Sequence, residues 1–190
     1  FVKNENSHKR VVLSALKLLC FFNIPIGLEK EIKNWCIELL NKSDLKADVK
    51  SNIIQFITFQ SVIKNDREFL NSIFEVLKEE TNKEINSSLL FMIRDVNDLD
   101  DLFWYLKQEF LRVNKIVKRN DVDDVHRGNA WVINELLLKL NNSNFFIELI
   151  SYHFKIGVHV DLNNEDAIRI LDRCLFFTGS EDDFITKFLI

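Results

Sequence analysis

Apolar residues recur along this chain at intervals of three and four, the spacing of helices that bury one face. Short polar clusters, such as 41–44 and 64–66, separate the periodic segments and fit tight connections between helices. Residues 157–162 are extended in character and fit a loop or one short strand. The pattern predicts about ten helices: 7–22, 28–41, 45–60, 66–79, 82–95, 99–119, 125–140, 144–156, 163–177 and a last one after 180.

The ends of the predicted helices carry recognisable signals. Pro25 and Gly27 form the clearest break in the chain and end the first helix. Asp98 is expected to cap the long helix that follows it, because an acid at a helix start complements the macrodipole. The longest apolar run, 11–22, is shorter than the roughly 18 residues of a membrane span and is interrupted by Ser14 and Lys17. We interpret this run as a buried helix and expect no membrane anchor.

Two parts of the chain have similar sequence patterns, and we call this internal similarity the echo. Placing Asp48-Val49-Lys50 on Glu84-Ile85-Asn86 is a shift of 36 residues. The shift superposes three apolar pairs: Ile53 on Leu89, Ile54 on Leu90, and Ile57 on Ile93. A repeat of this length, with two helical segments in each copy, is typical of stacked helical hairpins.

A weaker third copy begins at Asp124-Val125-His126, at a shift of 40 from the second. It brings Ala130 and Ile133 onto apolar positions of the second copy, but Asn129 stands where the earlier copy has an apolar residue. The motif of an acid, then Val or Ile, then often a base resembles HEAT-like repeat proteins, where it opens the second helix of each hairpin. The resemblance implies an all-α fold, a helical-hairpin α-solenoid within a single domain spanning 1–190. The chain lacks the Pro common in the first helix of such repeats, and an irregular helical bundle is the alternative.

The resemblance also implies a binding surface, because second helices of stacked hairpins usually line the concave side. If the aligned apolar positions of the three copies face the core, the aligned positions on the opposite side of these helices form one row with polar and basic neighbours. We call this set the aromatic strip: Gln55, Phe91 and Trp131, flanked by Asn52, Arg94 and Arg127. Aromatic and Arg side chains among small polar ones are typical of protein interfaces. The alternative is that Phe91 and Trp131 pack between neighbouring repeats.

Composition narrows the class of protein. With 47% hydrophobic and 28% charged residues the chain resembles a folded globular protein, and only 4 Gly and 1 Pro disfavour an all-β fold. A net charge of -4 argues against nucleic acid as the partner and leaves a protein partner favoured. The three cysteines, Cys20, Cys36 and Cys174, lie among apolar neighbours. We interpret them as reduced thiols of a cytoplasmic protein, the alternative being one disulfide and a spare thiol.

The sequence offers little for catalysis or for metal binding. Its four glycines are isolated, so no loop is built to cradle a phosphate. His153, His159 and Asp161 are the best metal candidates, but their spacing matches no standard site. The acidic turns 95–101 and 121–124 lack the calcium-loop pattern and fit helix capping. We therefore expect no catalytic residue, no cofactor and no bound metal.

Three functional hypotheses follow. The first is a non-catalytic helical-repeat module, a scaffold that binds a protein partner. The second is the sensor part of a larger bacterial defence NTPase of the STAND or NACHT kind, or a small immunity protein that neutralises a toxin. A start at Phe1 without an initiator Met is typical of a fragment and favours the larger protein. The third is an enzyme whose site assembles from distant acids and histidines.

Overall fold

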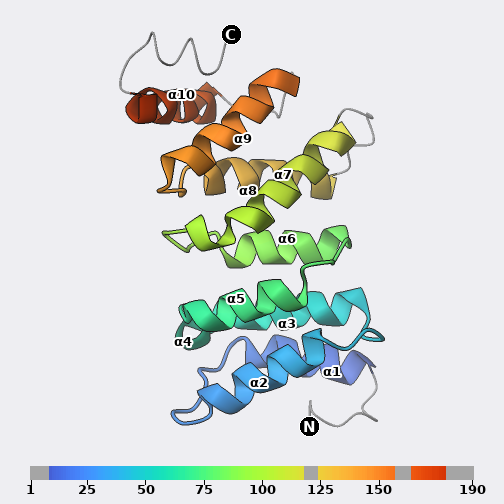
Figure 1. Ribbon diagram of the computed structural model, residues 1–190. Helices are drawn as coiled ribbons and strands as arrows, with labels where there is room; N and C mark the ends of the chain where they lie inside the picture. The colour runs from blue at the N-terminus through green and yellow to red at the C-terminus, as the bar shows by residue number, and fades with distance from the viewer. Residues whose placement is uncertain (1–8, 118–123, 157–163, 179–190) are drawn as a thin grey trace. The chain divides into compact units, whose positions relative to one another are not determined.

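The computed structural model describes residues 9–117, 124–156 and 164–178, and every regular element in these ranges is helical (Figure 1). The all-α prediction is confirmed, and the helix bounds agree with the sequence pattern to within a few residues. The expected helix after 180 and the extended segment 157–162 fall outside the described residues. The helices are α1 (Lys9–Leu19), α2 (Glu29–Leu40), α3 (Ala47–Phe59), α4 (Ser61–Lys64), α5 (Arg67–Val76), α6 (Lys83–Met92), the short 3-10 helix η1 (Asp100–Leu102), α7 (Phe103–Val117), α8 (Asp124–Leu137), α9 (Ser143–Ile156) and α10 (Asn164–Thr178).

The chain forms two compact units, Phe1–Asp95 and Val96–Ile190. The first contains α1 to α6, and the second contains η1 and α7 to α10. A single solenoid running through the whole chain stays a prediction. Within the described part of the chain, no helix combines the length and the apolar character needed to cross a lipid bilayer.

The first unit is built in two layers. Helices α1, α3 and α6 run side by side in one layer, and α2 and α5 lie together in the other (Figure 1). The six residues that the echo superposes are all completely buried: Ile53, Ile54, Ile57, Leu89, Leu90 and Ile93. The echo therefore identifies the buried positions of α3 and of the segment around α6. These contacts do not amount to the regular geometry of a HEAT repeat.

Charged side chains connect successive hairpins of the first unit. The ammonium group of Lys33 in α2 binds the carboxylate of Asp66, which precedes α5. Asp66 Oδ1 also accepts a hydrogen bond of 3.1 Å from the backbone N–H of Phe69, so the same carboxylate caps α5. Lys64 Nζ lies 2.6 Å from Asp95 Oδ2 and makes the corresponding connection one hairpin later. Asp95, which the sequence suggested for a cap, instead pairs with this lysine.

The second unit has its own core, formed where α7 packs against α8 and α9. The rings of Phe103 and Phe145 stack with centroids 4.1 Å apart. Asp100 Oδ1 accepts hydrogen bonds of 3.0 and 3.1 Å from the backbone N–H groups of Asn141 and Asn142. This carboxylate therefore fixes the turn before α9 against the turn before α7.

Two expectations about helix ends need correction. Asp98 does not cap a helix that begins at residue 99. Its Oδ1 accepts from the backbone N–H of Asp100 at 3.1 Å, and η1 intervenes before α7 starts at Phe103. The first helix is also not simply buried, because Leu16 is completely buried but Leu18 is 61% exposed. The run 11–22 carries more apolar side chains than one contact with α3 can cover.

Candidate partner-binding surface

The part of the aromatic strip in the first unit lies on α3 and on α6 with the residues after it. These two helices approach closely because small side chains meet between them, with Ser51 Oγ 2.6 Å from Ser88 Oγ. Gln55 follows Ser51 by one helical turn, and Phe91 follows Ser88 by almost one turn, so both lie beyond this contact in the same direction. Gln55 is exposed, and Phe91 is 44% exposed.

The polar members of the strip in this unit have partners of their own. The side-chain amide of Asn52 donates a 2.6 Å hydrogen bond to the backbone carbonyl of Asp48, one turn earlier in α3. Arg94 is half-buried and also interacts within the protein. Both residues therefore border the exposed pair Gln55 and Phe91, and neither is a free recognition group.

The remaining members of the strip lie in the second unit. Trp131 in α8 is 39% exposed, and Arg127 lies in the same helix with its side chain outside the described set. Phe91 and Trp131 are thus both partly accessible to solvent within their own units. The structure brings Gln55 and Phe91 onto one pair of helices, and the extension of the row to Trp131 stays a prediction.

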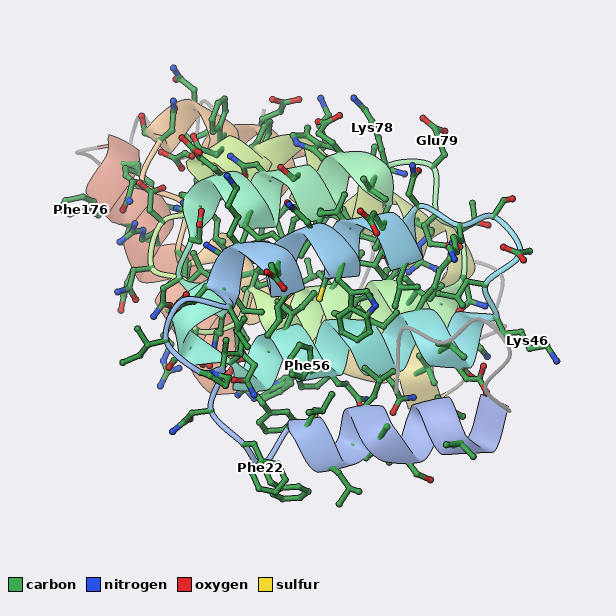
Figure 2. All side chains as sticks on the ribbon, turned by 90° about the horizontal axis from the view of Figure 1, so that it is seen from below. Phe22, Lys46, Phe56, Lys78, Glu79 and Phe176 are labelled. Atoms are coloured by element: carbon green, nitrogen blue, oxygen red, sulfur yellow. The ribbon has the colours of Figure 1, made fainter. Side chains whose placement is uncertain are left out.

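A second exposed apolar surface was missed by the sequence interpretation. We call it the apolar edge: Leu18, Phe21, Phe22, Ile26 and Phe59. Its exposed fractions run from 61% at Leu18 to 99% at Ile26. Figure 2 shows Phe22 projecting outward beyond the end of α1. Isolated exposed apolar residues are ordinary, but a cluster of large ones indicates a surface that another molecule covers.

Gln60 joins the two halves of the apolar edge. Its amide group donates to the carbonyl of Leu19 at 3.2 Å and to that of Phe22 at 2.9 Å. Gln60 is only 4% exposed, and the preceding residue is the exposed Phe59. The end of α1 is therefore fixed to the end of α3, and the aromatic rings of Phe22 and Phe59 emerge near one anchored point.

The turn after α1 holds Ile26 outward. The N–H of Leu28 donates to the carbonyl of Pro25 at 3.1 Å, and Gly27 has a φ of 90°, as the third residue of a type II turn requires. Gly27 N also donates to Glu29 Oε2 at 2.8 Å. A residue with a side chain would be strained at this φ. The turn is thus a fixed element that presents Ile26 to solvent.

One feature of the sequence could have revealed this edge. Leu18, Leu19, Phe21 and Phe22 fill four of five successive positions, and successive residues of a helix point 100° apart. They therefore surround the helix end instead of forming one stripe. A helix that is apolar on every side is either fully enclosed or has a partner on its second face.

Charge is distributed unevenly over the two layers of the first unit. In α3 no charged residue follows Lys50, and in α6 none follows Glu84. The exposed positions of α2 and α5 instead carry Glu31, Glu38, Glu68 and Glu75, together with Lys30. Interface cores are depleted of charged side chains, so the later parts of α3 and α6 have the chemistry of a contact surface, and the exposed Lys17 of α1 lies at its border.

The cysteine thiols and the possible metal ligands are the remaining groups that could carry chemistry. Cys36 and Cys174 are buried, and burial raises the pKa of each thiol to about 12, so both are protonated at neutral pH. Among the described residues no group of three or more His, Cys, Asp or Glu side chains could hold a metal ion. His159 and Asp161 lie outside the described residues, as does the side chain of His153.

The chain matches no protein-family model, no curated protein and no solved structure.

Proposed function

We propose that this protein is a non-catalytic helical module that binds a protein partner through the α1, α3 and α6 layer of its first unit. The contact surface combines the apolar edge with Gln55 and Phe91 of the aromatic strip. The observation that carries the proposal is the concentration of exposed Phe, Leu and Ile on and beside α1, α3 and α6, where α3 has no charged residue after Lys50 and α6 has none after Glu84. A sensor module of a larger defence NTPase would use the same surface in the same way.

The form of the surface supports a protein partner. Phe59 and Phe91 lie on α3 and α6, and Phe22 follows the end of α1; all three side chains are rigid, so they lose little conformational entropy when another surface covers them. Gln55, exposed on α3 one turn before Phe59, offers a side-chain amide for hydrogen bonds to a partner, and protein interfaces combine such polar groups with apolar ones. Ile26 on its fixed turn is suited to insertion into an apolar pocket of the partner.

The test is affinity capture from lysate of the source cells, with the full chain as bait and chemical cross-linking to locate contacts. The surface variant is Phe22→Ser with Phe59→Ser. The matched control is Glu68→Gln with Glu75→Gln on the opposite layer, which changes the same number of exposed residues. We expect a specific protein to be captured by the wild type and by the control. The surface variant should retain less than about a tenth of it, since interface aromatic residues commonly contribute more than 1.4 kcal/mol each.

Cross-links from the captured protein should reach Lys17, which is exposed on α1. Capture of the same protein by the surface variant at wild-type level would contradict the proposal. Cross-links confined to lysines of the α2 and α5 layer would contradict it as well. Circular dichroism of all three chains ensures that loss of capture is not loss of folding.

A further inference from the structure

Asn129 in α8 has a completely buried side-chain amide. Neither its Oδ1 nor its Nδ2 has a hydrogen-bond partner among the residues that the structure describes. Asn134 lies about one and a half turns later in α8 and is 3% exposed. Its Nδ2 likewise has no hydrogen-bond partner in the described part of the chain. Buried amide groups are almost always paired in folded proteins, because leaving one unpaired shifts an equilibrium by roughly tenfold or more. This helix therefore carries a penalty that folding alone does not explain.

Two residues of α6 provide a comparison: Asn86 is a buried amide with a partner, and Leu89 is aligned with Asn129. Asn86 is 1% exposed, but its Nδ2 donates to the carbonyl of Glu80 at 3.2 Å and so connects α6 to the preceding turn. In the repeat alignment the column of Asn129 holds Leu89, which is completely buried. The first unit thus uses Asn where a partner exists and Leu where none does. The second unit places an amide at the apolar core position.

The neighbouring residue weakens α8 further. Gly128 lies inside the helix, where glycine is less favourable than alanine. A Cβ added there would meet no atom within 4 Å, so packing does not require a glycine. Gly128 and Asn129 are therefore adjacent positions that both lower the stability of α8, and close packing accounts for neither.

The buried charge on α7 does not hold α8 in place. Glu109 is 1% exposed, and both of its carboxylate oxygens accept from Arg112 Nε at 3.0 Å. Arg112 lies one turn later in the same helix, so this ion pair moves with α7 and survives if α8 separates. Separation would give the amides of α8 access to water.

We propose that α8 is a conformational switch element that separates from α7 far more readily than α3 separates from α6. Opening hydrates Asn129 and Asn134 and uncovers the apolar face of α8, including Val132, Ile133 and Leu136, all nearly completely buried in the closed state. A molecule that binds this uncovered face would hold the second unit open. The amides and the glycine keep the two states close in free energy.

Native-state hydrogen exchange of the full chain, read by mass spectrometry or NMR, tests the proposal directly. Backbone amides of 132–137 should exchange at least about tenfold faster than those of 53–57, because each unpaired amide favours opening by that order. Gly128→Ala and Asn129→Leu should each slow exchange in α8 by several-fold to tenfold and leave 53–57 unchanged. The matched control Asn86→Leu removes a paired amide and should speed exchange in α6 instead.

Equal protection of α8 and α3 in the wild-type chain would overturn the proposal. Faster exchange in α8 of Asn129→Leu would overturn it too, since this would mean that the amide is satisfied in the closed state. Failure of Asn129→Leu to fold would have the same meaning. Gly128→Ala is independent of the amide, and unchanged exchange in α8 of that variant would show that helix stability does not control the opening.

Discussion

Ser51 Oγ lies 2.6 Å from Ser88 Oγ, and this pair is where α3 and α6 approach each other between the two hairpins of the first unit. Ser88 also donates to the backbone carbonyl of Glu84 at 3.0 Å, so its hydroxyl stays satisfied if Ser51 is removed. The contact is therefore a sensitive reporter of whether the hairpins stack in solution.

A double-mutant cycle of Ser51→Ala and Ser88→Ala measures this contact. We expect each single substitution to lower the free energy of unfolding by about 0.5–1 kcal/mol, with a coupling energy of similar size because one hydrogen bond is shared. Urea denaturation of the four chains gives the values. Strict additivity of the two substitutions would contradict the α3–α6 contact.

Gln60→Ala should weaken the attachment of α1 to α3. The substitution removes both hydrogen bonds from the side-chain amide to the carbonyls of Leu19 and Phe22. We expect the free energy of unfolding to fall by about 1–2 kcal/mol. Gln55→Ala, at an exposed position of α3, is the control and should change it by less than about 0.5 kcal/mol. Equal effects of the two substitutions would mean that Gln60 does not fix the end of α1.

Phe56 and Phe59 lie in one helix but should respond differently to replacement by alanine. Phe56 is 3% exposed, and its ring meets Trp35 edge-on with centroids 6.4 Å apart. Phe56→Ala should cost about 3–5 kcal/mol because it leaves a cavity in the core. Phe59 is 67% exposed, so Phe59→Ala should cost less than about 0.5 kcal/mol. Urea denaturation of the two variants measures both costs, and a large loss of stability in Phe59→Ala would place its ring in the core.

Stability should depend on the ionisation of Asp66. The hydrogen bond from Lys33, then that from the N–H of Phe69, lower the pKa of the Asp66 carboxyl. A lowered pKa in the folded state adds stability above the unfolded value of about 3.9, and this stability is lost as the pH falls through the folded value. Asp66→Asn keeps a capping oxygen but loses the ion pair, so at pH 7 we expect a loss of up to about 1 kcal/mol. The difference from the wild type should shrink below about pH 4.

Urea denaturation of the wild type and of Asp66→Asn at pH 7 and at pH 3 makes this comparison. The control Asp44→Asn alters an exposed acid between α2 and α3 and should leave the pH profile close to that of the wild type. A difference between wild type and Asp66→Asn that persists undiminished at pH 3 would mean that charge on Asp66 does not contribute.

The core of the first unit could be predicted from the sequence because helical periodicity directly reports which side chains avoid water. Ile53 and Leu89 show this, since the echo paired them and both are completely buried. The same logic gave a wrong interpretation of α1. Periodicity counts apolar positions but does not say how many neighbouring helices cover them, and α1 has α3 on one side while Leu18 and Phe22 stay exposed.

Other features depended on contacts that sequence spacing does not encode. Asp98 is a residue type that often caps helices, yet its carboxylate accepts a hydrogen bond from the N–H of Asp100. The reason is that η1 occupies the position where the start of α7 was expected. Gln60 looks like an ordinary polar residue at a helix end, and only the position of α1 shows that its amide is buried. Gln55 and Phe91 were placed on neighbouring helices by the echo, and the structure has them there.

The separation of charge between the two layers of the first unit also affects how molecules meet this protein. Exposed glutamates such as Glu31, Glu38 and Glu68 repel an approaching acidic molecule from the α2 and α5 side, while the later parts of α3 and α6 carry no charge and exert no such force. Encounters with acidic proteins are thereby biased towards the side that carries Phe22 and Phe59. At high ionic strength this orientation is lost, because screening extends over about 10 Å at 0.1 M salt and over only about 3 Å at 1 M.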